Sequence, residues 1–162
     1  MKKGSFIFIV LALISCIAMC GKMYLTRKKP NNFYYTNLLA KNLNIDQKKQ
    51  VKVLDTNYYK TQDVSNEDIQ IIFSFLKELK KPNFVTPSSS FDEKPSYKIF
   101  FSFPESSKKY VMNVYNHEYL SVQPWDGDFS MDYISTINIP YRFSIYNVCK
   151  NAFFKNQNSI KK

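Results

Sequence analysis

An uncharged apolar run occupies residues 5–21, with Lys2 and Lys3 before it and Lys22 after it. A helix that spans a bilayer needs about 20 apolar residues. Residues 6–25 supply that length if the lysine within them extends its ammonium group to the lipid headgroups. The pattern therefore predicts a membrane helix at the N-terminus.

Three interpretations of residues 1–25 remain open: an uncleaved transmembrane anchor, a lipoprotein signal and a cleaved secretory signal. The first fits the length of the apolar run. The second rests on Leu13-Ile14-Ser15-Cys16, which is similar to a lipobox, so Cys16 is the lipidation candidate and Cys20 the second choice. The third fits the basic start, although no Ala-x-Ala cleavage site follows the apolar run.

Beyond this segment, apolar residues recur at spacings of two, which is typical of half-buried strands. The predicted strands are 50–54, 58–62, 97–103, 110–115, 119–123 and 129–134. Short turns between the later runs predict antiparallel hairpins.

One stretch instead has apolar residues at spacings of three and four, which predicts a helix over 66–81. Ser65 is a good N-cap, with Asp68 in the place of a capping-box glutamate, and Pro82 stops the helix. A second helix is expected over 141–154, where the apolar spacing is less regular.

These elements predict a single α+β domain over residues 50–154, with an antiparallel meander sheet of about four to six strands packed against helix 66–81. Residues 26–49 are expected to be a basic linker or stalk, in which 35–43 could equally form a short helix. Residues 155–162 form a basic tail.

The net charge of +10 is concentrated at the two ends of the chain. Residues 1–49 contain nine basic residues and one acidic residue, whereas 50–149 contain ten basic and twelve acidic residues. Only Arg27 and Arg142 are arginines, and a nucleic-acid domain would show a basic folded face with arginine contacts. We therefore expect anionic membrane lipid, not nucleic acid, to attract the basic ends.

The candidates for chemistry are isolated. His117 is the only histidine and lies in a predicted turn, with no nucleophile or orienting group indicated beside it. Cys149 lies on an apolar helical face, as a buried free cysteine does. Asp126, Asp128 and Asp132 lack the rest of a calcium loop. We therefore predict no catalytic residues, no cofactor and no metal site.

Aromatic residues are abundant: the chain has 12 Tyr, 14 Phe and one Trp. In strand 97–103, Phe100 lies on the side opposite to its aromatic neighbours. If both sheet faces are apolar, one is covered by helix 66–81 and the other by the C-terminal segment or a partner. The expected partner surface, in the 82–95 loop and the turn after the fifth strand, consists of Phe84, Phe91, Gln123, Trp125 and Phe129.

Four stretches carry a resemblance to a known family. They are residues 65–69 with Ile72 and Leu76, then 97–99, 110–115 and 119–129, the last containing a Gln-Pro-aromatic-x-Gly motif. Over about residues 50–135 the chain resembles small uncharacterised envelope proteins, often lipoproteins, of low-GC Gram-positive bacteria that carry a domain of unknown function. The resemblance implies an envelope location and one α+β domain, without catalytic residues.

The leading hypothesis is a membrane-anchored, extracytoplasmic, non-enzymatic module that binds an envelope protein, peptide or glycan. The signal-like start favours export, whereas the lysines after the apolar run favour a domain inside the cell. One alternative is an immunity or inhibitor protein against a toxin or hydrolase. Another is an enzyme whose site carries no recognisable motif.

Overall fold

The computed structural model describes residues 12–20, 33–125 and 131–159, with side chains up to residue 154. The chain divides into two units, Met1–Pro30 and Asn31–Lys162. In the first unit, residues 12–20 are helical and exposed. Among the described residues, no helix has both the length and the apolar character needed to cross a bilayer. The rest of the expected membrane segment lies outside the described residues.

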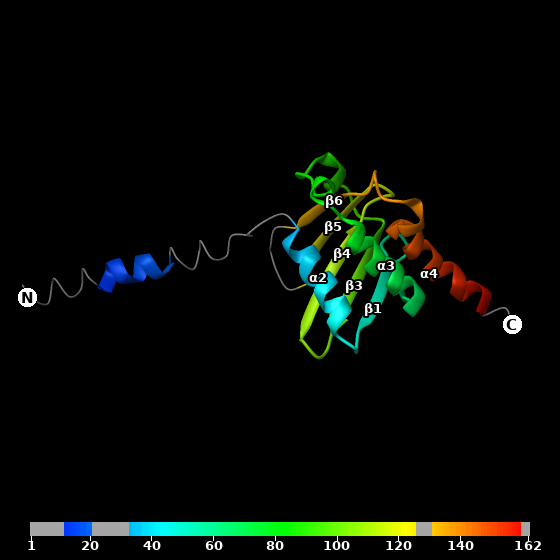
Figure 1. The fold of residues 1–162 in the computed structure, drawn as a ribbon, viewed down its shortest axis with the longest axis horizontal. Coiled ribbons are helices and arrows are strands. Elements are labelled where there is room, and N and C mark those ends of the chain that lie inside the picture. Colours follow the sequence, from blue (N-terminus) through cyan, green and yellow to red (C-terminus); the bar gives the residue numbers. More distant parts are fainter. Residues whose placement is uncertain (1–11, 21–32, 126–130, 160–162) are drawn as a thin grey trace, which may run out of the picture. The chain divides into compact units, whose positions relative to one another are not determined.

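The second unit is built on a six-stranded antiparallel sheet, with the strand order β2-β1-β3-β4-β5-β6 (Figure 1). The strands are β1 (Gln50–Asp55), β2 (Lys60–Asp63), β3 (Tyr97–Phe103), β4 (Lys108–Val114), β5 (Tyr119–Pro124) and β6 (Asp132–Ser135). The α+β class and the meander from β3 to β6 are confirmed. The first hairpin differs from a simple meander, because β3 pairs with β1 and leaves β2 at the edge.

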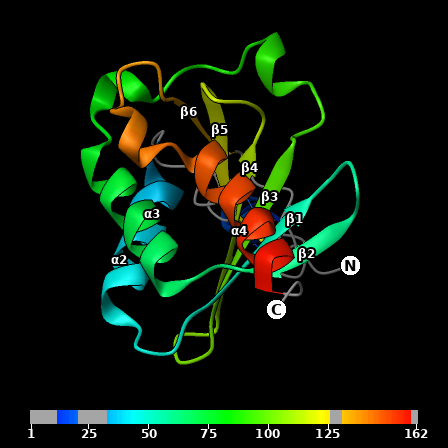
Figure 2. The ribbon, with the colours of Figure 1, turned by 90° about the vertical axis from the view of Figure 1, so that its right-hand side faces the viewer.

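Three helices, α2 (Tyr34–Ile45), α3 (Asn66–Glu78) and α4 (Ile145–Ser159), lie on one side of the sheet (Figure 2). Facing them, Val53, Ile99, Met112 and Val122 pair in one row across four strands, and all four side chains are fully buried. The main core lies between these strands and the helices.

The helix α2 belongs to this core. Leu39 and Leu43 are almost completely buried in it. Of the two alternatives for residues 35–43, the structure therefore shows the helix. A linker was expected over residues 26–49, whereas the structure shows that part of this stretch is the helix α2. A short helix is stabilised mainly by packing of its apolar face, and α2 packs that face into the core.

Two helix boundaries differ from the predictions. The helix α3 ends at Glu78, because Leu79 already has an extended backbone and Pro82 lies in a separate 3-10 turn, η1 (Lys81–Asn83). At the other end of the domain, residues 141–143 form the 3-10 turn η3 (Tyr141–Phe143) and α4 begins only at Ile145. In both places the departure from the predicted helix lies near a proline and includes a 3-10 turn.

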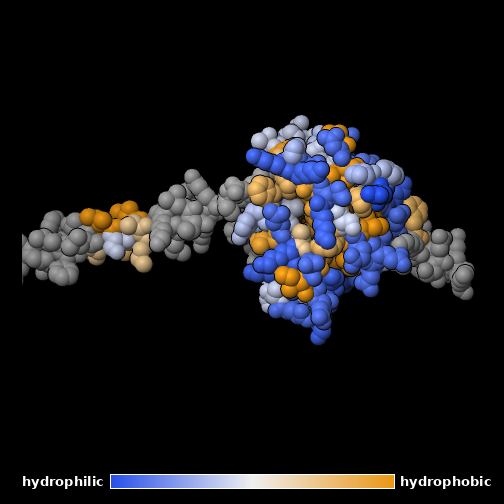
Figure 3. Space-filling model, in the orientation of Figure 1, coloured by the Kyte–Doolittle hydropathy of each residue, from blue (hydrophilic) through white to orange (hydrophobic). Residues whose placement is uncertain are grey.

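The surface seen in Figure 3 is mostly hydrophilic, with small separate apolar patches. A large continuous apolar patch would indicate a protein or membrane interface. On this side of the molecule such a patch is absent among the residues that the structure describes.

Candidate functional site

The sheet has a second face, opposite to the helices, because successive side chains of a strand point to opposite sides. On this outer face, Lys52, Phe100, Val111 and Gln123 pair in one row across β1, β3, β4 and β5. None of these four residues belongs to the main core. The outer face therefore packs separately from the main core. A buried aromatic residue covers one end of this face, and a hollow lies at the other end.

Phe91 closes one end of the outer face. It belongs to η2 (Ser89–Phe91), and its ring contacts Tyr115, Tyr119 and Tyr133 edge-on, with centroid distances of 5.4, 5.4 and 4.8 Å. The Phe91 side chain is only 8% exposed. Its expected place on an exposed partner surface is therefore wrong, because three tyrosines cover its ring.

A polar cluster follows along the same face. The Asn113 side-chain N–H group donates to the Ser121 hydroxyl at 3.0 Å, and the Tyr115 hydroxyl lies 3.3 Å from the same oxygen. Burial raises the pKa of Tyr115, and the hydrogen bond with Ser121 acts in the opposite direction. The side-chain oxygen of Asn113 is buried and finds no partner among the described residues.

The open end is a hollow of about 340 Å³ around Phe100 and Trp125. The two rings contact each other with a centroid distance of 4.6 Å and an interplanar angle of 53°. The Trp125 side chain is half exposed. The backbone of Trp125 is held in place, because its N–H donates to the Lys109 carbonyl at 3.1 Å. The lining of this hollow also includes Lys52, Thr61, Ser102 and Lys109.

Lys52 is paired with Asp63 of β2 across the edge of the sheet, at 3.9 Å. Both side chains are mainly exposed, so this ion pair contributes little to stability. The ammonium group of Lys52 therefore remains available to a ligand in the hollow.

Two of the five expected surface residues lie together on the outer face. Gln123 is in the same row as Phe100, and Trp125 contacts the Phe100 ring. Phe84 lies elsewhere, against Phe33 with a centroid distance of 5.5 Å, and Phe129 lies outside the described residues.

Of the residues that line the hollow, the prediction named only Trp125, and among those that it missed are Phe100, Lys52 and Lys109. Phe100 could have been found from its position opposite to the other aromatic residues of its strand. The two lysines come from other strands, and no spacing in the sequence places them beside Phe100.

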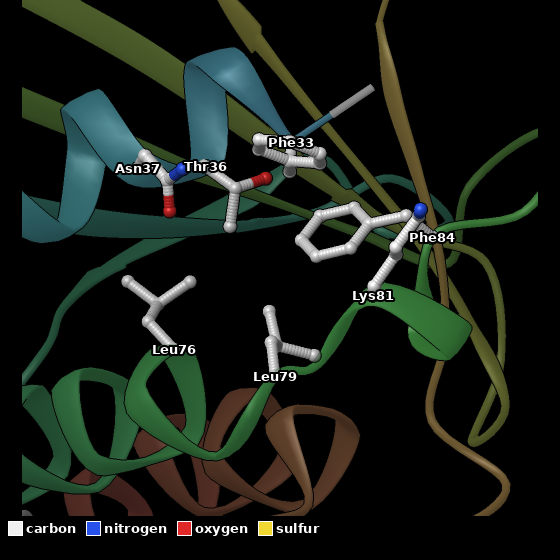
Figure 4. A pocket seen from close by; sticks show the side chains of 7 residues that line it. All are labelled: Phe33, Thr36, Asn37, Leu76, Leu79, Lys81 and Phe84. Carbon is white, nitrogen blue, oxygen red and sulfur yellow. The ribbon is translucent and has the colours of Figure 1, made fainter. Parts of the chain in front are cut away.

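A groove of about 470 Å³ lies on the helix side, between α2 and α3 (Figure 4). In Figure 4, Leu76 from α3 and Leu79 from the residue just after this helix point towards α2, from which Thr36 and Asn37 come. Lys81 is the one charged residue in the described lining. The groove therefore offers an apolar surface and no acid–base pair.

Asp132 has a structural role. Its Oδ2 accepts the Thr36 backbone N–H at 2.7 Å and the Thr36 hydroxyl at 2.8 Å, and the side chain is fully buried. This carboxylate caps α2 from β6, since the N-cap residue Phe33 makes no side-chain cap.

Within the described residues, no group of three His, Cys, Asp or Glu side chains could hold a metal ion.

His117 and Glu118 line a third hollow, of about 410 Å³, together with Ser144. The His117 ring lies 4.0 Å from the Tyr146 ring. Ser144 accepts the Asn147 backbone N–H at 3.4 Å, as a residue at a helix start does. His117 and Ser144 share no hydrogen bond in the described part of the chain, and Asp132 is absent from this lining.

Cys149 lies in the main core and is 1% exposed, as expected for a buried free cysteine. Burial raises the pKa of its thiol. The thiolate is the nucleophilic form, so the fold keeps this sulfur unreactive.

Residues 29–149 match the model of a family described as "Domain of unknown function (DUF4883)". The chain therefore belongs to this family, as the resemblance in its sequence indicated. A solved structure, described as that of a putative lipoprotein from Clostridium perfringens, is similar to this chain, with 35% sequence identity and a TM-score of 0.69. The match covers 78% of this chain and 98% of that one. No curated protein matches.

Proposed function

We propose that this chain is a lipid-anchored, extracytoplasmic binding module, and that its partner occupies the Phe100–Trp125 hollow. The observation that carries the proposal is Trp125, a half-exposed tryptophan held against Phe100 on a sheet face. Tryptophan is enriched where proteins bind partners, because it offers a large apolar surface with one polar N–H group. The outer face is thus the binding surface.

Binding, rather than catalysis, suits the residues that line the three hollows. Apart from His117 and Glu118, their titratable groups are lysines and the phenol of Tyr141. A nucleophile and a base must lie within hydrogen-bonding reach. The His117 hollow supplies no such pair among the described residues, and the Phe100–Trp125 hollow has no base other than its lysines.

The lipid anchor is supported by the similar Clostridium perfringens protein, which is described as a putative lipoprotein. Cys16 follows the lipobox-like Leu13-Ile14-Ser15, and its side chain is exposed. Anchoring through this cysteine would hold the domain at the outer surface of the membrane.

The anchor is tested by feeding cells an alkyne-labelled fatty acid and measuring label on the purified protein. We expect Cys16→Ser to lose the label and Cys20→Ser to retain it. Label lost only in Cys20→Ser would assign the lipid to that residue. An unlabelled wild-type chain with an intact Met1 would contradict lipidation.

The binding surface is tested with a photoreactive amino acid placed at Gln123, next to the hollow, in cells that express the full chain. We expect irradiation to attach one envelope component, and Trp125→Ala to abolish the product. The matched control carries the photoreactive residue at Lys41, an exposed position of α2. An identical set of products from both positions would contradict a specific site on the outer face.

A further inference from the structure

Resting on that proposed binding role, we infer that the ligand of the Phe100–Trp125 hollow is an acidic glycan, a chain of sugar rings carrying carboxylate or phosphate groups. Three features of the hollow lead to this chemistry: its place on a sheet face, its aromatic floor and the sign of its charge.

The hollow lies on the outer face of the sheet. Thr61 in its lining belongs to the edge strand β2, whereas Lys52, Phe100 and Lys109 lie in β1, β3 and β4. These three strands are paired on both sides, so their backbone groups are engaged in the ladder. An extended peptide gains most of its affinity from backbone hydrogen bonds along an open sheet edge. Over β1, β3 and β4, recognition comes from side chains, which favours a ligand other than an extended peptide.

The floor of the hollow is aromatic and its rim is polar. Trp125 is half exposed and Phe100 is partly exposed in this lining, and the C–H faces of sugar rings stack on aromatic rings. Thr61, Ser102 and Gln50 line the same hollow and can donate and accept hydrogen bonds with sugar hydroxyl groups. Its volume of about 340 Å³ is near the lower end of ligand sites, so it suits a short stretch of glycan.

The charged residues that line the hollow are positive. Lys52 and Lys109 line the hollow, and Lys98 lies on the same face of β3. Among the described strand residues of the outer face, the one carboxylate is Asp63, at the edge and 84% exposed. Two ammonium groups beside an aromatic floor complement a ligand with negative groups along a chain of rings.

Trp125 provides a direct measurement, because it is the only tryptophan in the chain. The full chain in detergent micelles is titrated with tetragalacturonate and with phosphorylated maltotetraose, and Trp125 fluorescence is recorded. The matched neutral ligands are the methyl ester of tetragalacturonate and maltotetraose itself, which keep the rings and remove the charge. We expect saturable fluorescence changes with at least one acidic ligand, and binding at least about tenfold weaker for its neutral counterpart.

Calorimetry on variants then locates the site. We expect Trp125→Ala and the double variant Lys52→Gln/Lys109→Gln to weaken binding at least about tenfold each. The matched controls, Tyr141→Ala and Lys41→Gln, change an exposed aromatic residue and an exposed lysine away from the hollow and should bind like the wild type. Unchanged binding by Trp125→Ala would overturn the proposal.

Three further outcomes would overturn it. One is equal affinity for the acidic and the neutral glycans, another is equal affinity for poly-glutamate of the same charge, and the third is binding to anionic lipid vesicles but to neither acidic glycan. If neither acidic glycan binds while the photoreactive residue at Gln123 still captures a specific protein, the ligand class is wrong and the proposed binding role stands. If both experiments fail, the proposed function fails as well.

Discussion

Asp132 shows how one buried carboxylate joins two distant parts of this chain. It accepts two hydrogen bonds from Thr36, which is 96 positions earlier, and so connects the start of α2 to the edge strand β6. A buried polar group that loses its partner is costly, since it can no longer be satisfied by water. The Asp132 carboxylate therefore stabilises the start of α2, although the two are far apart in the sequence.

We expect Asp132→Ala to lower the free energy of unfolding by about 2–4 kcal/mol, because it leaves two buried donors of Thr36 unpaired. Thr36→Val removes the hydroxyl alone and should cost about 1 kcal/mol. Urea denaturation measures both, with the exposed residue change Asp92→Asn as the control. A loss for Asp132→Ala no larger than that of the control would contradict the capping role.

At Cys149, burial has a chemical consequence. Since burial raises the pKa of the thiol, we expect it to remain unmodified by Ellman's reagent in the folded protein at pH 8. In a Cys16→Ser/Cys20→Ser background, the thiol should react at the rate of global unfolding and become fully reactive in denaturant. Rapid reaction without denaturant would show that the core around Cys149 opens locally.

Among the elements, the segment between α3 and β3 departs most from its prediction. A loop of fourteen residues without structure is unusual in a compact domain. Residues 82–95 instead contain η2 and part of η1, and Phe84 forms a bridge with Ile134 of β6. Phe91 holds the end of this segment on the outer face of the sheet.

We expect Phe91→Ala to lower the free energy of unfolding by about 3 kcal/mol and to expose residues 82–95 to protease. The reason is the loss of a ring that packs between three tyrosines. Limited proteolysis with mass spectrometry locates the cleavage, and Phe154→Ala, which changes a 53% exposed ring, is the control. Protection of the segment equal to that in the control would mean that other contacts hold it in place.

The helix α3 shows which element features are readable in a sequence. The Ser65 hydroxyl accepts the Asp68 backbone N–H at 3.2 Å, as the capping pattern predicted, and donates to the Asp68 carboxylate at 2.7 Å. Both partners lie within one turn, so local spacing contains the information. The cap of α2 by Asp132 is not local, and the sequence around Phe33 contains no sign of it.

Across the whole domain, several buried or partly buried phenols are expected to make stability sensitive to alkaline pH. Burial raises the pKa of Tyr97 to about 12, with further contributions from Tyr146 and Asp55. The pKa values of Tyr35 and Tyr115 are raised as well. Between the ordinary tyrosine pKa of about 10 and these higher values, the folded state holds protons that the unfolded state has lost.

The free energy of unfolding should therefore fall as the pH rises from about 10 to about 12, and the contribution of Tyr97 should be fully present below pH 10. Urea midpoints measured at pH 8, 10 and 11.5 test this, with Tyr97→Phe as the comparison. The variant should lose less stability over this range than the wild type. An equal or steeper loss in Tyr97→Phe would contradict the role of this phenol.

Sheet register decides which of the expected partner-surface residues lie together on the outer face. Gln123 and Trp125 were expected at a partner surface, and they lie on the outer face with Phe100. Phe91 was also expected at a partner surface, in the 82–95 loop, but it is covered by tyrosines that come from just after β4, from β5 and from β6. Those tyrosines lie 24 to 42 positions from Phe91 in the chain, so no local pattern could predict that they would bury its ring.

The sequence alone determined the α+β class, the later hairpins and the capped start of α3, because alternation, tight turns and N-caps depend on residues a few positions apart. Tertiary structure alone decided which side chains meet across strands. It placed Lys52, Phe100 and Lys109 around one hollow, buried Phe91 and made Asp132 the cap of a helix 96 residues away. These contacts depend on strand order and register, which are set when the whole chain packs around its core.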